Sequence, residues 1–206
     1  FFFPPSPVEP KIEYLQGYFS DHDLKPGKKD FFTEYVLGES RPKAIFVTPV
    51  DVASNGKGLV FVADSGARQI FVLDLLNQTS RMLSPPRLAG GMMRSFGIPF
   101  SVTVADDGRL YVSDVVAKQV DVFDENERYL LSITDPALAR PTAVAVDTQR
   151  QKVYVLDTAN HQLGIFDLQG RLIRYLGTRG SEAGQFNFPT DVDVDDQVKD
   201  LLDSID

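Results

Sequence analysis

Short runs of alternating hydrophobic and polar residues, each followed by a polar turn, succeed one another from about residue 41 onward. In one stretch, Asp106-Asp107-Gly108 provides a tight turn, because Asp-Gly suits backbone positions that need a positive φ. Alternation with a period of two places one face of a strand in a core, so the pattern around this turn predicts antiparallel strands. The predicted strands are Phe100–Val104, Leu110–Ser113, Gln119–Phe123 and Tyr129–Ile133.

The same four-strand layout returns along the chain. It begins near Pro49 and again at Pro141, and a further copy opens at Pro189. Four short strands every roughly 40 to 50 residues are typical of the blades of a β-propeller, whereas a β-sandwich gives no reason for a motif to recur at this spacing. In the first copy we interpret Asn55–Gly58 as an insertion before the second strand. The strands predicted in the copy at Pro141 are Ala143–Val146, Val153–Leu156, Gln162–Phe166 and Leu172–Leu176.

The N-terminal part of the chain lacks this pattern. Its early prolines favour an extended lead-in without a hydrogen-bonded ladder, Lys11–Ser20 predicts a strand, and Asp30–Leu37 predicts a short helix. We therefore expect residues 1–40 to form an arm, a strand and a short helix, and residues 41–206 to form propeller blades with the last repeat incomplete. Two interpretations stay open. Either blades are missing from this chain, or four blades close with the strand at Lys11–Ser20 completing the last one.

Composition narrows the classes of partner. A net charge of −8 argues against nucleic acid or an anionic membrane surface. No hydrophobic run reaches the roughly 18 to 20 residues of a membrane-spanning helix, so we expect no transmembrane segment. The sequence contains no Cys, which excludes disulfides, a Cys nucleophile, thiolate metal sites and covalent haem attachment within it.

An Asp follows the second strand of each copy, and a cationic or imidazole side chain comes four residues later. One interpretation is a carboxylate-rich channel that binds a metal, with His161 as a ligand or base. We favour a structural role, in which each carboxylate accepts backbone N–H groups in a tight turn and pairs with the residue four positions on. His161 occupies the position of Arg or Lys in the other copies, so we assign no catalytic residue. The pairs are Asp64 with Arg68, Asp114 with Lys118, and Asp157 with His161.

An acidic cluster opens the last copy. Asp191, Asp193 and Asp195 would share one face of a strand, with Val192 and Val194 on the other. Carboxylate oxygens suit Ca²⁺, which makes this the one metal or cofactor candidate, although the spacing of an EF-hand is absent. Like charges on one strand face repel, so the face must be solvated or bind a cation, and we favour the solvated interpretation.

Two stretches resemble NHL repeats. One is Asp157–Leu163 with its flanking strands, and the other is Gly177–Pro189, which reads G-x-x-G-x-x-x-G-x-F-x-x-P. The likeness extends over roughly residues 42 to 206, and the proline-rich N-terminus is similar to the lead-in of bacterial exported six-bladed NHL-type propellers. This resemblance implies a periplasmic or extracellular protein whose signal peptide has been removed, with a lipid anchor in some relatives.

The resemblance also sets the expected function. It implies a non-enzymatic propeller that binds a protein partner or scaffolds an assembly, and exported multihaem cytochromes are a candidate partner. The alternative is a metal-dependent lyase or lactonase acting at the central channel, because enzymes of these classes resemble the fold. Their His and Glu ligand sets find no match in the sequence, so the non-enzymatic interpretation is favoured.

Overall fold

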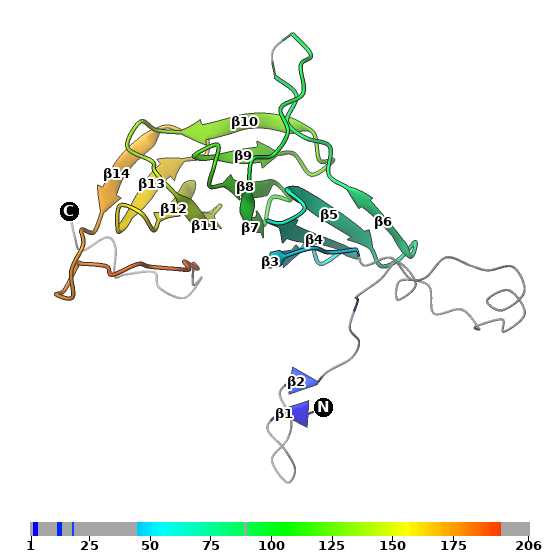
Figure 1. Ribbon diagram of the computed structural model, residues 1–206, viewed down its shortest axis with the longest axis horizontal. Coiled ribbons are helices and arrows are strands. Elements are labelled where there is room, and N and C mark those ends of the chain that lie inside the picture. The colour runs from blue at the N-terminus through cyan, green and yellow to red at the C-terminus, as the bar shows by residue number, and fades with distance from the viewer. Residues whose placement is uncertain (1, 4–11, 14–17, 19–44, 89, 195–206) are drawn as a thin grey trace, which may run out of the picture. The chain divides into compact units, whose positions relative to one another are not determined.

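A computed structural model of the chain describes residues 2–3, 12–13, 18, 45–88 and 90–194 (Figure 1). Contacts between residues divide the chain into two compact units, Phe1–Phe46 and Val47–Asp206. In the first unit, β1 (Phe2–Phe3) pairs antiparallel with β2 (Ile12–Glu13).

The N-terminal prediction is therefore wrong in one respect. Phe2 and Phe3 belong to a hydrogen-bonded ladder, which they can join because they precede the prolines and keep their own N–H groups. The strand predicted from Lys11 is present at Ile12–Glu13. The helix predicted over Asp30–Leu37 lies outside the described residues.

The described residues of the second unit form three four-stranded antiparallel sheets, each with its strands in chain order. These sheets are the blades that the repeat predicted, and the all-β prediction is confirmed (Figure 1). Blade 1 comprises β3 (Pro49–Ser54), β4 (Leu59–Asp64), β5 (Gln69–Asp74) and β6 (Thr79–Met82). Blade 2 comprises β7 (Pro99–Val104), β8 (Leu110–Asp114), β9 (Gln119–Phe123) and β10 (Tyr129–Thr134). Blade 3 comprises β11 (Pro141–Asp147), β12 (Lys152–Asp157), β13 (Gln162–Asp167) and β14 (Leu172–Leu176).

The interpretation of Asn55–Gly58 as an insertion is wrong. These residues connect β3 to β4, and the connection is no longer than residues 105–109 between β7 and β8. Asn55 holds it as a tight turn, since its Oδ1 accepts the N–H groups of Lys57 at 2.8 Å and Leu59 at 3.0 Å. The first repeat is longer than the second because the connection between β6 and β7 is longer than that between β10 and β11.

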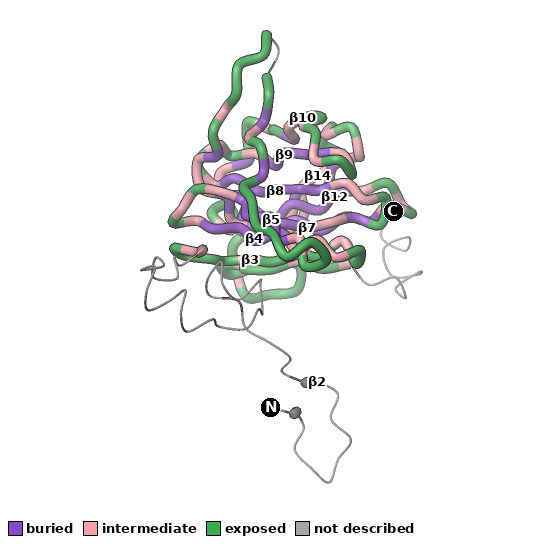
Figure 2. The backbone as a smooth tube through the Cα atoms, turned by 90° about the vertical axis from the view of Figure 1, so that its right-hand side faces the viewer, coloured by how far each residue is buried: buried purple, intermediate pink, exposed green. Residues whose placement is uncertain are grey.

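Hydrophobic residues on the facing sides of successive blades form the core, which runs through the interior of the second unit (Figure 2). Burying one large apolar side chain in such a cluster contributes about 1.5–3 kcal/mol, so each interface between blades is a main source of stability. Blades 1 and 2 share a cluster that includes Phe61, Ile70, Phe96, Leu110 and Phe123. Blades 2 and 3 share a cluster that includes Tyr111, Val122, Ile133, Val153 and Phe166.

The first strands of the blades are also linked directly. The Oδ2 atom of Asp51 in β3 accepts the N–H of Val102 in β7 at 2.9 Å. The hydroxyl of Thr103 in β7 donates to the carbonyl of Val144 in β11 at 2.6 Å. These bonds from side chain to backbone hold β3, β7 and β11 side by side, as the inner strands of a propeller are.

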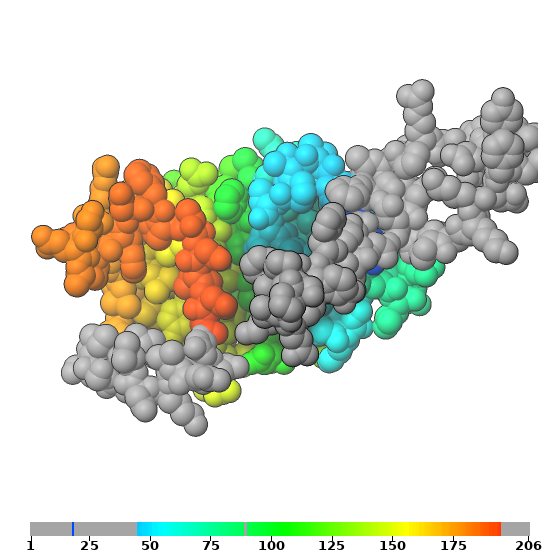
Figure 3. Space-filling view, turned by 90° about the horizontal axis from the view of Figure 1, so that it is seen from below, coloured from blue at the N-terminus to red at the C-terminus, as the bar shows by residue number. Residues whose placement is uncertain are grey.

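The segment after β14 returns across blade 3 (Figure 3, orange to red). Val192 and Val194 pack against the cluster formed by Ala145, Tyr154 and Ile165. Residues 191–194 are not a strand in the described part of the chain, although their hydrophobic positions cover the face of blade 3 as a further blade would.

The buried hydroxyl of Tyr111 gives a stability prediction. The side chain is fully buried between blades 2 and 3, and its hydroxyl makes no hydrogen bond to the described residues. Burial raises the pKa of Tyr111 to about 12, so the phenol stays neutral. An unsatisfied buried hydroxyl costs about 1–3 kcal/mol, and Phe61 occupies the matching position in β4. Tyr111→Phe should therefore raise the free energy of unfolding, measured by urea denaturation, by about 1 kcal/mol.

Tyr129→Phe is the matched control for this measurement. The Tyr129 hydroxyl bonds to Ser132 Oγ at 2.8 Å, so its removal should lower the free energy of unfolding. Equal losses in the two variants would show that the Tyr111 hydroxyl does have a partner.

Candidate functional site

The three repeated aspartates fasten each blade to the segment that precedes it. Asp64 accepts the N–H groups of Val47 at 2.6 Å and Thr48 at 2.9 Å, and also that of Ala67 in its own turn at 2.8 Å. Asp114 and Asp157 repeat the arrangement in blades 2 and 3. Asp114 accepts from Gly97, Ile98 and Ala117, and Asp157 accepts from Ala139, Arg140 and Asn160.

The expected pairing of each Asp with the residue four positions on is wrong. Among the described residues, no ion pair or hydrogen bond joins Asp64 to Arg68, Asp114 to Lys118, or Asp157 to His161. The shared feature of that position is its backbone, because all three residues have a φ of 54° to 55°. The turn requires the left-handed conformation there, and the carboxylate is satisfied by backbone N–H groups instead.

His161 connects blade 3 to the segment after β14. It is 6% exposed, and its Nδ1 atom accepts the N–H of Phe188 at 3.0 Å. The His161 and Phe188 rings meet edge to face with centroids 4.5 Å apart, and the Arg179 guanidinium lies 5.7 Å from the centroid of Phe188. The imidazole is thus occupied by packing and hydrogen bonding, in accord with the structural role.

The acidic residues that open the last copy lie beside the inner strands. Asp191 and Asp193 are exposed, and each accepts the N–H of the next residue in the chain, at 2.9 and 2.8 Å. They border an inner groove of about 440 Å³ that is lined by β3, β7, β11 and residues 191–194. Asp195 lies outside the described residues, and those described contain no group of three or more His, Asp or Glu that could hold a metal ion.

Additional residues between β6 and β7 form a hairpin that projects from blade 2, here called the rim hairpin (residues 85–88 and 90–94; Figures 1 and 2). Leu88 N–H donates to the carbonyl of Met92 at 2.7 Å, and Arg94 N–H donates to that of Pro86 at 2.9 Å. Gly90 and Gly91 at the tip have φ of 84° and 83°, which glycine adopts without steric cost. Met92 and Met93 are 71% and 56% exposed.

An ion pair between a partly exposed arginine and a buried aspartate anchors the rim hairpin to blade 2. Arg94 at its base contacts Asp121 in β9, which is fully buried, and its Nη1 lies 3.8 Å from Asp114 Oδ2. The other Asp121 oxygen accepts from Gln119 Nε2 and Ser132 Oγ, both at 2.6 Å. Removing Arg94 would leave the buried carboxylate of Asp121 without a cation, which destabilises the folded state. The hairpin is therefore firmly held where it meets the blade.

Sequence reasoning missed both Arg94 and Asp121. A signal for Asp121 was present, because it stands in a buried strand at the position of Phe71 in β5 and Gly164 in β13. A carboxylate at such a position requires a buried partner. Which cation provides it could not be deduced, since Arg94 lies in the part of the repeat that has no counterpart in the other copies.

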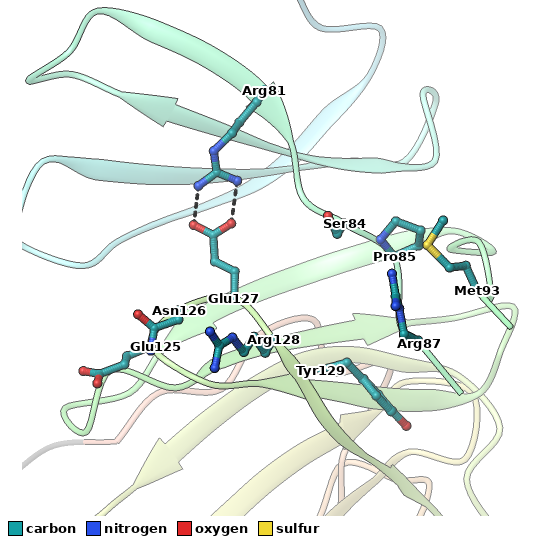
Figure 4. Close-up of a pocket in the computed structure, with 10 residues that line it drawn as sticks. All are labelled: Arg81, Ser84, Pro85, Arg87, Met93, Glu125, Asn126, Glu127, Arg128 and Tyr129. Carbon is teal, nitrogen blue, oxygen red and sulfur yellow. Dashed lines mark hydrogen bonds and ion pairs between the residues drawn. The ribbon is translucent and has the colours of Figure 1, made fainter. Parts of the chain in front are cut away.

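The base of the rim hairpin borders a cleft of about 780 Å³, here called the rim cleft (Figure 4). On one side Arg81 of β6 forms two hydrogen bonds of 2.5 Å with the carboxylate of Glu127, which bridges blades 1 and 2. Arg87 and Arg128 also line the cleft, and neither forms an ion pair with another described residue. The remaining lining residues are Ser84, Pro85, Met93, Glu125, Asn126 and Tyr129.

Comparison with known proteins agrees with this geometry. The family model described as "NHL repeat" matches residues 138–166, which hold β11, β12 and most of β13. This chain contains an NHL repeat. The match includes the turn with Asp157 and His161, and blades 1 and 2 contain related turns at Asp64 and Asp114.

Solved structures show the same fold at low sequence identity. The chain is similar to hydrazine synthase from Kuenenia stuttgartiensis (TM-score 0.54, 14% identity, covering 74% of this chain and 40% of that one). It is similar to a chain of a nidogen/laminin complex (TM-score 0.58, 18% identity, covering 78% of this chain and 59% of that one). It is also similar to a catalytically inactive virginiamycin B lyase from Staphylococcus aureus with quinupristin (TM-score 0.54, 13% identity, covering 70% of this chain and 44% of that one). The chain thus spans 40 to 59% of these solved chains, and the likeness concerns the fold alone.

The backbone bonds of Asp64 predict how stability depends on pH. Burial by itself raises the pKa of this carboxyl, but the N–H groups of Ala67, Thr48 and Val47 outweigh that effect and hold the pKa below 3.8. A lowered pKa stabilises the fold above the unfolded value of about 3.9, and that contribution disappears as the pH falls through the folded value. Asp64→Asn should lower the free energy of unfolding by roughly 1–3 kcal/mol at pH 7 and by less near pH 3.

Urea titrations at the two pH values measure this effect. Asp193→Asn is the control, because Asp193 is exposed and accepts a single local N–H. A deficit in Asp64→Asn that is the same at both pH values would contradict the role of the charge.

Proposed function

We propose that this NHL-repeat chain is a non-enzymatic protein-binding or scaffold module, and that the rim hairpin is its recognition element. The observation that carries the proposal is an anchored hairpin with exposed methionines at 71% and 56%. An isolated two-stranded hairpin is marginally stable in water. The ion pair of Arg94 with the buried Asp121 therefore stabilises the rim hairpin. It holds the hairpin in place before a partner arrives, which reduces the entropy lost on binding.

The side chains on the hairpin suit contact with a protein. Methionine is enriched at protein interfaces and adapts its shape to the surface that it meets. Leu88 is 37% exposed and adds apolar area near Met92. A propeller of similar fold occurs in the nidogen/laminin complex, which supports protein binding as a use of such blades.

Location and partner complete the proposal and rest on the resemblance to bacterial exported propellers. We propose a periplasmic or extracellular site of action within a larger assembly, with exported multihaem cytochromes as the candidate partner. The sequence has no Cys, so covalently attached haem would belong to the partner. No helix in the described residues is long and apolar enough to cross a membrane.

A crosslinking experiment tests the proposal. A photoreactive amino acid at position 88, near the hairpin tip, should crosslink a discrete partner in extracts of cells that produce the protein. Met92→Ser/Met93→Ser should reduce the crosslinked product at least tenfold, because the apolar contact is lost. Leu76→Ser/Val116→Ser is the matched control, since these side chains are similarly exposed at 76% and 59% on other parts of the blades. Equal crosslinking in both double variants would overturn the proposal.

A metal-dependent lyase or lactonase remains the second candidate function. The fold similarity to virginiamycin B lyase favours it, and the exposed Asp191 and Asp193 beside the inner groove are the residues to test as metal ligands. Metal analysis of the purified protein separates the two functions. One tightly bound divalent ion per chain, lost in Asp191→Asn/Asp193→Asn, would favour the enzyme. The proposed module should contain less than about 0.1 equivalent after dialysis.

A further inference from the structure

We infer that the rim cleft binds an acidic peptide segment of the partner, with one acidic side chain at Arg87, another at Arg128, and an apolar side chain beside Tyr129. This inference rests on the proposed protein-binding function and goes further by stating the chemistry of the bound segment. It assigns a role to a cleft that neither the repeat nor the comparisons explain.

The first support is the distribution of charge. The chain carries a net charge of −8, yet three arginines line this one cleft. Glu127 is already taken by both Nη atoms of Arg81, so it is not available to Arg87 or Arg128. Two exposed guanidinium groups without an ion pair among the described residues can each form charge-assisted hydrogen bonds to a carboxylate of a ligand.

Glu125 is the remaining acid of the cleft, and it is directed elsewhere. Its side chain lies against the turn between β7 and β8, where a Cβ on Gly108 would lie 3.2 Å from Glu125 Cβ and 3.8 Å from Oε2. Figure 4 shows its carboxylate pointing away from Arg87 and Arg128. A negatively charged ligand near the two arginines therefore need not displace an internal acid.

The second support is an apolar wall of fixed shape. Tyr129 is held by the hydrogen bond of its hydroxyl to Ser132 Oγ and by an edge-to-face contact with Phe123, with centroids 6.0 Å apart. Pro85 and Met93 complete the apolar part of the lining. A volume of about 780 Å³ falls within the roughly 300–1,000 Å³ of clefts that bind drug-sized ligands, so the cleft can hold a few side chains of a peptide. Apolar walls beside two cations favour a peptide with both acidic and apolar side chains over a free inorganic anion.

The position of the cleft connects it to the rim hairpin. Pro85, Arg87 and Met93 belong to the hairpin, and Arg128 and Tyr129 lie at the start of β10 or directly before it. A segment that contacts the exposed methionines can therefore continue into the cleft. Cleft and hairpin form one recognition surface with an apolar part and a cationic part.

Binding of two peptide libraries tests the inference. One library contains fluorescein-labelled octapeptides with two fixed Glu residues among random positions, and the other has Gln at the fixed positions. Fluorescence anisotropy should show the Glu library binding the native chain at least about tenfold more tightly, since hydrogen bonds to charged groups are the stronger ones. Arg87→Gln/Arg128→Gln should remove that difference. Lys57→Gln/Arg140→Gln, which removes two exposed cations outside the cleft, should preserve it.

Several results would overturn the inference. These are equal binding of the two libraries, a preference for Glu that survives in Arg87→Gln/Arg128→Gln, or displacement of the peptides by inorganic phosphate at about 1 mM. Urea denaturation of each variant shows whether it is folded, because exposed side chains should leave the midpoint unchanged. Crosslinking at the hairpin without a preference for Glu would sink only the cleft assignment. A preference for Glu without hairpin crosslinking would sink the proposed hairpin function and leave the cleft as a peptide site.

Discussion

The fold depends on a buried carboxylate that accepts backbone N–H groups from two separate stretches of chain. In each blade, the Asp at the end of the second strand binds the segment before the first strand and also its own following turn. The next residue then donates back to the same preceding segment, as Ser65 does to the carbonyl of Thr48. A charged acceptor in a buried position strengthens these bonds, because water does not compete for it. This closure fixes where each blade begins, and the links between inner strands and the apolar clusters build on that position.

The same chemistry appears once in a different role. Asp121 is a fully buried carboxylate as well, but it is satisfied by the Arg94 side chain and by Gln119 and Ser132. The closing aspartates hold elements that every blade has, whereas Asp121 holds an element that only blade 2 receives. A repeat that is structurally uniform thereby acquires one blade with a distinct surface, and both the rim hairpin and the rim cleft lie on that surface.

The sequence was sufficient for the blades because their information is local and repeated. Alternating residues, short polar turns and a recurring Asp define four strands without knowledge of distant contacts. The sequence was not sufficient for the candidate site, because Arg94 and Asp121 meet only after the chain has folded. The interpretation of Asn55–Gly58 as an insertion was wrong because the sequence does not show where each strand ends. Both that turn and the rim hairpin contain glycines, and only the strand ends show which of them lengthens the repeat. The pairing expected for Asp64, Asp114 and Asp157 was wrong because their carboxylates accept hydrogen bonds from backbone N–H groups. Such donors cannot be recognised in a sequence pattern.

The anchor of the rim hairpin also constrains how this surface can change. The hairpin enters and leaves between β6 and β7, so its length can vary without altering the register of any blade. Loss of the whole hairpin would destabilise the blade, because Asp121 would remain there as a buried charge with no cation beside it. Hairpin and aspartate thus form one inherited unit, and a chain that discards the first must also replace the second with an uncharged residue of similar size.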